Sequence, residues 1–186
     1  EYGDAEYEVL LYEFKADLNT YLAQRPGLPV QSMADLIDFN RRHADAEMPF
    51  FQQEILELAQ EKGDLKEAAY LEALATSKRL AGPEGIDVAI KEHRLDAIIA
   101  ITGGPAWHTD LVTGDHGLGS CSQPAAVAGY PHITVPMGYV FGLPVNISFF
   151  STAWSEPTLI RLAYAFEQLT QHRQAPRYLP TVDLTG

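Results

Sequence analysis

Residues 129–150, GYPHITVPMGYVFGLPVNISFF, combine apolar, β-branched runs with glycine and proline at close intervals. Three prolines fall in this stretch: Pro131, Pro136 and Pro144. Proline inside a helix removes a backbone donor and clashes with the preceding turn, and the run is also too interrupted for a membrane-spanning helix. The stretch therefore predicts two strands, at residues 132–136 and 143–150, joined through residues 137–142.

The residues before this stretch carry most of the negative charge and follow a helical pattern. Residues 1–93 hold 19 acidic and 9 basic side chains, and residues 94–186 hold 6 and 4, within a net charge of −12. An acidic surface repels phosphate backbones, so nucleic-acid binding is not expected. Apolar positions recur at helical intervals in five segments, which lie at residues 5–23, 31–43, 49–63, 64–82 and 83–94.

Capping residues indicate where these helices begin and end. Ser32 is followed three residues later by Asp35, and Asp64 by Glu67, which is the spacing of reciprocal N-terminal caps. Proline favours the first turn of a helix and glycine its end. The residues expected in these two roles are Pro49, Pro83, Gly63 and Gly82.

The second half of the chain predicts strands and a final helix. The expected elements are a short buried strand at 95–101, a polar glycine-rich connection at 102–123, a short helix or turn at 124–130, the two strands above, and an amphipathic helix at 155–173. Ser155 is the expected N-cap of the last helix, and His172 and Arg173 are expected in its last turn. This order predicts an α/β fold, a small sheet flanked by helices, with a sheet edge left open unless further strands come from elsewhere.

No complete catalytic or metal-binding arrangement stands out. Cys121 and His116 could form a nucleophilic pair, but a lone cysteine also serves as a small apolar side chain. All five lysines lie before residue 94, outside the glycine-rich connection. Four residues of metal-binding types lie in that connection without a zinc spacing, and they could equally stabilise turns: His108, Asp110, Asp115 and His116. No catalytic residue, metal or other cofactor is therefore assigned.

Trp107 follows the glycines of TGGPAW, directly after the strand at 95–101. Ligand sites of α/β sheets gather at strand ends, so the indole could wall a pocket. It could equally fold back onto the core. Gly104 permits a sharp turn here, and Pro105 stiffens the next step. The sequence leaves both interpretations open.

The region from AGYPHITVPMGYVFGLPVNISFF to WSEPTLIRLAYAFEQ resembles the C-terminal part of amidase signature enzymes. The matching positions are Gly129, Pro131, Val135, Pro136, Gly138, Gly142, Leu143, Pro144, Val145 and Glu156. GGPAW, PAAVAGYP and WSEP resemble the peptide-amidase-like branch most closely. The resemblance extends over about residues 64–180, and more loosely over the preceding helices.

This resemblance implies the C-terminal part of the amidase signature fold, in which helices flank a mixed β-sheet. The family uses a serine nucleophile, a second serine on a cis peptide and a lysine, and no such Gly/Ser-rich signature occurs in these residues. Residues 1–186 are thus expected to form a single C-terminal portion, helical over 1–93, with strands, the glycine-rich loop and the terminal helix over 94–186. Such a portion would line the substrate pocket of an amidase and be inactive alone. The alternative is a complete, non-catalytic α/β binding or regulatory module.

The resemblance also implies substrate-binding residues and partners. The candidate substrate-binding residues are Gly104, Pro105, Trp107, His108, Asp110 and Ser122. The expected partner is the N-terminal half of the amidase or a second copy of the chain, with a small amide or a peptide amide as substrate. No membrane partner is expected. Cys121, the single cysteine, fits a reducing compartment, so a cytoplasmic location is expected.

One departure from the family concerns the amidotransferase A subunits. These carry an acidic residue shortly before a P-x-N-x-x-G segment, where it helps to hold the amino group of glutamine. The equivalent GLGSCSQPAAVAG contains no acid, Ala126 replaces the asparagine, and Asp115 is the nearest carboxylate. The resemblance therefore implies a substrate whose α-amino group is blocked or absent.

Overall fold

The computed structural model describes residues 2–178, which form two compact units divided between Ser77 and Lys78. Helix α5, Ala68–Ala81, contains the boundary between them. The last two positions of the region expected to resemble amidases, 179 and 180, lie outside the described residues. Within residues 2–178, no helix is both long and apolar enough to cross a membrane.

The first unit is helical, as the sequence predicts. It contains α1 (Gly3–Ala23), α2 (Met33–Arg42), α3 (Ala44–Glu47), α4 (Glu54–Gln60) and the start of α5. The helices pack around a small core made of Leu11, Met33, Ile37 and Ala59, with Leu18 and Leu56 against it. Apolar side chains at helical spacing on α1, α2 and α4 thus meet in one cluster.

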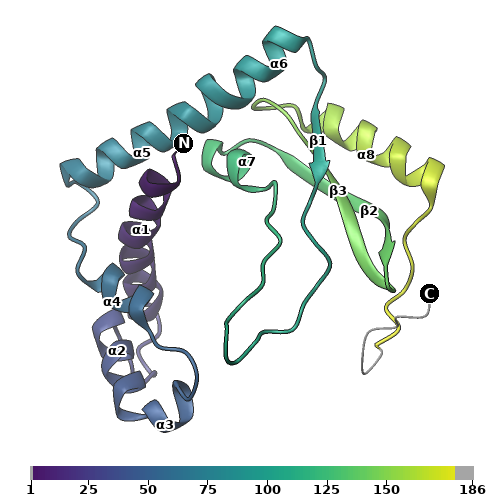
Figure 1. The fold of residues 1–186 in the computed structure, drawn as a ribbon. Coiled ribbons are helices and arrows are strands. Elements are labelled where there is room, and N and C mark those ends of the chain that lie inside the picture. The colour runs from purple at the N-terminus through teal and green to yellow at the C-terminus, as the bar shows by residue number, and fades with distance from the viewer. Residues whose placement is uncertain (1, 179–186) are drawn as a thin grey trace. The chain divides into compact units, whose positions relative to one another are not determined.

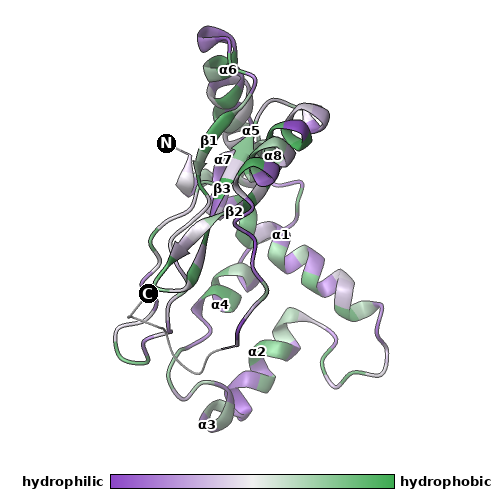
Figure 2. Ribbon diagram, turned by 90° about the vertical axis from the view of Figure 1, so that its right-hand side faces the viewer, coloured by the Kyte–Doolittle hydropathy of each residue, from purple (hydrophilic) through white to green (hydrophobic). Residues whose placement is uncertain are grey.

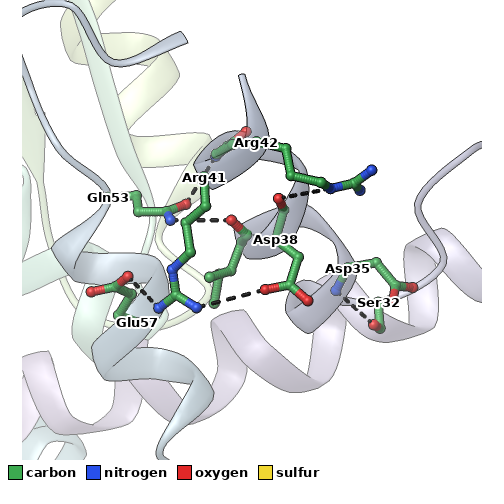
Figure 3. Close-up of polar contacts among 9 residues, drawn as sticks. Ser32, Asp35, Asp38, Arg41, Arg42, Gln53 and Glu57 are labelled. Carbon is green, nitrogen blue, oxygen red and sulfur yellow. Dashed lines mark hydrogen bonds and ion pairs between the residues drawn. The ribbon is translucent and has the colours of Figure 1, made fainter. Parts of the chain in front are cut away.

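The predicted cap of α2 is confirmed. The Ser32 hydroxyl accepts a hydrogen bond from the backbone N–H of Asp35 at 3.1 Å (Figure 3). The Asp35 carboxylate accepts one from the N–H of Gln31 at 2.9 Å. The bond from Gln31 is the largest cause, ahead of the Ser32 hydroxyl, of the lowered pKa of Asp35. Donors aimed at a carboxylate favour its charged form.

The helix predicted over residues 49–63 is wrong in extent, because α4 begins only at Glu54. Gln53 is 9% exposed and directs its side-chain amide to α2 (Figure 3). Its nitrogen donates to the carbonyl of Ile37 at 3.2 Å, and its oxygen accepts from the Asn40 amide at 3.1 Å. These contacts hold the segment before α4 against α2.

Long-range polar contacts fasten α1 to the segment around residues 60–70. The Lys62 ammonium lies 2.7 Å from the Glu8 carboxylate, and the Tyr70 hydroxyl donates to Glu13 at 2.8 Å. Glu67 does not reach back to cap a helix as its spacing with Asp64 predicts. Its carboxylate accepts the Tyr12 hydroxyl at 2.6 Å instead, and this hydrogen bond raises the pKa of Tyr12 to about 12.

Gly82 does not end the fourth helix, so that prediction is also wrong. The chain continues from α5 through a π-helical turn, η1 (Gly82–Ile86), into α6 (Asp87–His93). The π turn accommodates Pro83 in its first positions. Gly85 is required there, since a Cβ at this position would lie 2.5 Å from the Leu80 carbonyl oxygen.

The sheet of the second unit has three antiparallel strands in the order β1-β3-β2. They are β1 (Ile98–Ile101), β2 (His132–Val140) and β3 (Leu143–Phe150). The α/β fold is thus confirmed. The connection between β2 and β3 is shorter than predicted, because the strands are joined by Phe141 and Gly142 alone, with φ of 48° and 74°. Positive φ at both central residues is the pattern of a type I′ hairpin turn.

Helices cover both faces of this sheet (Figure 1). On one face, α8 (Glu156–Thr170) brings Leu159 and Ala163 against Phe149. On the other face, Ile86 of η1 and Ala125 of α7 (Gln123–Ala128) pack against Phe150. Neighbouring residues of a strand point to opposite faces, so Phe149 and Phe150 serve one core each.

The prediction that the first strand is buried is wrong. Ile99 and Ile101 are 61% and 62% exposed, although β1 is coloured as hydrophobic in Figure 2. They share a face with Phe149 and Ile147 by register, but α8 packs mainly on β2 and β3. Among the described strands, β1 pairs only with β3, so the expected open edge is present.

The final helix begins where the sequence predicts but ends earlier. Ser155 precedes α8, yet its hydroxyl donates to the carbonyl of Thr152 at 2.7 Å instead of capping the helix. The helix ends at Thr170, with Gln171 in the left-handed region at φ of 50°. His172 and Arg173 therefore lie beyond the last turn, where the sequence placed them inside it.

Candidate functional site

The six candidate residues lie on the connection between β1 and α7, which leaves the sheet and returns as a long irregular loop (Figure 1). We call residues 103–121 the β1–α7 loop. It has an outgoing arm, from Gly103 to Asp110, and a returning arm, from Gly114 to Cys121, and the two arms contact each other near the sheet and at the tip. Gly103 and Ser120 form an isolated β-bridge near the sheet, and Asp110 and Gly114 form another at the tip.

Gly104 lets the two arms approach. A Cβ at this position would lie 2.6 Å from Leu118 Cδ1 and 2.7 Å from Leu118 Cβ, closer than atoms can pack. The absence of a side chain is thus a steric requirement here, whereas the sequence predicted only a sharp turn. Pro105 follows, half-buried, and leads toward Trp107.

Trp107 is held by the opposite arm rather than by either core cluster. Its indole N–H donates to the Asp115 carboxylate at 3.3 Å, and its ring lies beside Gly117, where a Cβ would be 3.8 Å away. The side chain is 48% exposed. An indole with one edge anchored and about half its surface free has apolar area to offer a ligand.

Asp110 organises the tip of the β1–α7 loop. One carboxylate oxygen accepts the backbone N–H groups of Val112 (2.8 Å) and Thr113 (3.0 Å), and the other accepts the Thr113 hydroxyl at 2.6 Å. These bonds, the Thr113 hydroxyl first, hold the pKa of Asp110 well below its usual range. His116 Nε2 lies 3.5 Å from the same carboxylate. The carboxylate is therefore already occupied by the loop itself.

The other two candidates are exposed. His108 lies on the outgoing arm, one residue after Trp107. Ser122 directly precedes α7, where its hydroxyl lies 2.9 Å from that of Ser120. The structure thus places Trp107, His108 and Asp110 along one arm and Ser122 at the base, and the substrate-binding role of all six residues stays a prediction.

The structure separates the two groups weighed as a nucleophilic pair. The imidazole of His116 contacts Asp110 and Thr113 at the tip. Cys121 is at the base, where its backbone N–H donates to the Thr102 carbonyl at 3.3 Å. No group of three or more metal-binding side chains that could hold an ion occurs in the part of the chain that the structure describes.

Sequence reasoning missed a hydroxyl cluster at the base of the loop. Thr102 Oγ1 lies 2.7 Å from both Thr134 Oγ1 on β2 and Ser148 Oγ on β3. The three hydroxyls belong to separate segments, so only the strand register could reveal their proximity. Thr134 and Ser148 are register partners in the β2–β3 pair, which a correctly aligned hairpin would have indicated.

Comparison with known proteins gives three informative relatives, although no protein-family model matches the chain. A probable amidase of Arabidopsis thaliana is 37% identical over 172 residues, which cover 91% of this chain and 30% of the relative. The A subunit of the glutamyl-tRNA(Gln) amidotransferase of Desulforudis audaxviator is 49% identical, but over 55 residues only, 29% of this chain and 11% of the relative.

The solved structure of a peptide amidase from Stenotrophomonas maltophilia is similar over almost the whole chain. Over the matched part the two sequences are 47% identical, with a TM-score of 0.86, and the match covers 95% of this chain and 35% of that one. The chain therefore spans about a third of the length of these amidases.

Proposed function

Because the chain belongs to the amidase signature family, we propose that it forms part of the substrate-binding region of an enzyme that hydrolyses peptide amides or other small amides. The observation that carries this proposal is the 47% identity and TM-score of 0.86 to a peptide amidase over 95% of the chain. The match to an amidotransferase A subunit extends over only 29% of the chain, which favours the peptide-amidase-like activity.

We place the catalytic serines and lysine outside these residues. Amide hydrolysis needs a nucleophile, a base and oxyanion donors that converge on one point. Two of the lysines are engaged elsewhere: Lys15 Nζ donates to the Gln60 carbonyl at 2.8 Å, and Lys62 pairs with Glu8. The loop hydroxyls of Ser120 and Ser122 lie against each other. These contacts argue against a catalytic role for these lysines and serines.

The β1–α7 loop is the proposed wall of the substrate site. Trp107 would contribute apolar contact to the substrate, and His108, exposed beside it, a polar contact. Asp110 would act mainly by keeping the tip folded, since its carboxylate accepts hydrogen bonds from Val112 and Thr113. The absence of an acidic residue from GLGSCSQPAAVAG favours a substrate without a free α-amino group.

The proposed partner is the remainder of an amidase polypeptide, which would cover the open edge of β1. Ile99 and Ile101 expose apolar surface beside unpaired strand backbone, which is a surface that native sheets normally protect. A single free cysteine, Cys121, suits a reducing compartment, so we also propose a cytoplasmic location.

Kinetics test this function directly. The 186-residue chain alone is expected not to hydrolyse a peptide amide. In an amidase that contains these residues, Trp107→Ala should lower kcat/KM for its amide substrate by a factor that corresponds to about 1–3 kcal/mol and leave the thermal unfolding midpoint nearly unchanged. Turnover by the chain alone that is abolished in Cys121→Ala or Ser122→Ala would overturn the proposal, as would unchanged kinetics in the Trp107 variant.

A further inference from the structure

Thr102 connects the sheet to both arms of the β1–α7 loop. Its backbone N–H donates to the Asn146 carbonyl of β3 at 2.9 Å, and its carbonyl accepts the Cys121 N–H of the returning arm at 3.3 Å. Its hydroxyl lies between Ser148 of β3 and Thr134 of β2. All three polar groups of this one residue are therefore engaged, just before Gly103 and Gly104.

Only one direction of proton donation allows all of these hydroxyl hydrogen bonds to form together. Thr134 Oγ1 donates its proton to the Ile147 carbonyl at 3.2 Å, so the proton between Thr102 and Thr134 must come from Thr102. The proton between Ser148 and Thr102 must then come from Ser148, since each hydroxyl has a single proton. The chain of donors thus runs from Ser148 through Thr102 to Thr134. Ser148 is fully buried, and Thr102 is its acceptor.

We propose that Thr102 is a positioning residue that sets the direction of the β1–α7 loop and thereby the orientation of Trp107. The two glycines that follow have a wide choice of backbone conformations, so they cannot define a direction themselves. Thr102 can define this direction, because it is hydrogen-bonded to two strands and to the returning arm. The consequence for substrate selection rests on the proposed function, but the orientation of Trp107 does not.

The hydroxyl, rather than the shape of the side chain, should carry this effect. Thr102→Val keeps a β-branched side chain of the same size, whereas it removes the acceptor of a buried Ser148 hydroxyl. Thr102→Ser keeps the hydroxyl, so the orientation of Trp107 should remain that of the parent. Thr109→Val removes a hydroxyl from an exposed position of the same loop and serves as the matched control.

Tryptophan fluorescence of the 186-residue chain tests the proposal without any activity. The chain has two tryptophans, so Trp154→Phe leaves Trp107 as the sole tryptophan, which excitation at long wavelength selects over the tyrosines. Trp154 is 88% exposed, so its replacement should disturb the fold little. In this background, Thr102→Val should shift the emission maximum to longer wavelength and raise quenching by acrylamide. Thr102→Ser and Thr109→Val should match the parent. Unchanged emission and quenching in folded Thr102→Val would overturn the proposal.

The double variant Thr102→Val with Ser148→Ala separates an effect on the orientation of Trp107 from an effect on the stability of the chain. It removes the buried donor together with its acceptor, so the midpoint of urea unfolding should return toward that of the parent. The altered Trp107 signal should persist, because the link between loop and sheet is still absent. A signal that returns together with stability would mean that Thr102 is only a stabilising residue.

Kinetics in an amidase containing these residues distinguish this inference from the proposed function. Thr102→Val should raise KM with little change in kcat, as expected when a residue acts on substrate binding through another residue. If Trp107 changes its emission while kcat and KM stay unchanged, the substrate role of the loop is wrong and the positioning of Trp107 by Thr102 is upheld.

Discussion

The Tyr12 hydroxyl donates to the Glu67 carboxylate over 2.6 Å, although the two residues are 55 positions apart. The contact fastens the middle of α1 to the turn before α5. The Lys62 ammonium lies 5.5 Å from the centre of the Tyr12 ring and pairs with Glu8 of the same helix. Tyr12 is therefore one of several residues of α1 that bind the segment around residues 60–70.

This contact should make stability depend on pH in the alkaline range. The folded pKa of Tyr12 is about 12, above the ordinary tyrosine value of 10.0. The protonated hydroxyl therefore contributes fully to the free energy of unfolding below pH 10.0, and this contribution is lost as the pH rises toward 12. Urea unfolding measured across this range should show the loss in the parent and a weaker dependence in Tyr12→Phe. Tyr7→Phe, on an exposed position of the same helix, is the control and should behave as the parent. An identical slope in all three proteins would contradict the role of this pair.

Gly104→Ala should open the β1–α7 loop without unfolding the protein. The added methyl group meets both the Cβ and the Cδ1 of Leu118, so rotation of the leucine side chain cannot relieve the contact. Limited proteolysis within residues 103–120 should become faster, and global stability should change by only about 0.5 kcal/mol, as is usual at a surface site. Gly117→Ala, whose new methyl group would have an ordinary contact with Trp107 at 3.8 Å, is the control. Equal cleavage rates would show that the arms are not packed against each other.

Gly85→Ala should destabilise the second unit by about 1–3 kcal/mol, the usual cost of overpacking. The new methyl group would lie 2.5 Å from the Leu80 carbonyl oxygen, a backbone atom inside a continuous helix that cannot turn away. Urea unfolding followed by circular dichroism measures the effect. Gly27→Ala, where nothing lies within 4 Å of the new methyl group, should leave the midpoint unchanged. A neutral Gly85→Ala would mean that the π turn relaxes to an ordinary helix at little cost.

The open edge of β1 should drive association of the isolated chain. Ile99→Lys combined with Ile101→Lys places charge on an exposed apolar edge, which is how native sheets prevent pairing between edges. Light scattering should show larger particles for the parent than for this variant at equal concentration. Leu169→Lys, on the 86% exposed end of α8, is the control and should associate like the parent. A monomeric parent would argue against an uncovered interface at this edge.

The sequence predicted best those features that depend on residues close together in the chain. Ser32 and Asp35 are three residues apart, and their cap is present as expected. Ser155 precedes the last helix as expected, but its hydroxyl found the carbonyl of Thr152, an equally local alternative. Local patterns thus located elements reliably and selected between competing local hydrogen bonds less well.

Features that depend on distant neighbours could not be predicted in this way. Gly82 continues into a π turn beside Tyr130, 48 positions later, whose hydroxyl would lie 3.0 Å from a Cβ at position 82. The exposure of Ile99 follows from the place of β1 at the edge of the sheet, which no pattern within β1 encodes. The hydroxyls of Thr102 and Ser148 meet across 46 positions. The six predicted site residues share the connection between β1 and α7, but no sequence signal indicates how the two arms of that connection pair.

The two-residue turn at Phe141 and Gly142 also bears on the order in which the sheet assembles. Strands joined by so short a turn can pair by zipping outward from it, within about 1–10 μs in isolated hairpins. The strand β1 must instead close a chain segment that reaches from Ile101 to Ile147 before its first contact forms, and the entropy of that closure slows it. We therefore expect the β2–β3 hairpin to form early and β1 to join late, so that the strand that leads into the candidate site is the last to be secured in the nascent protein.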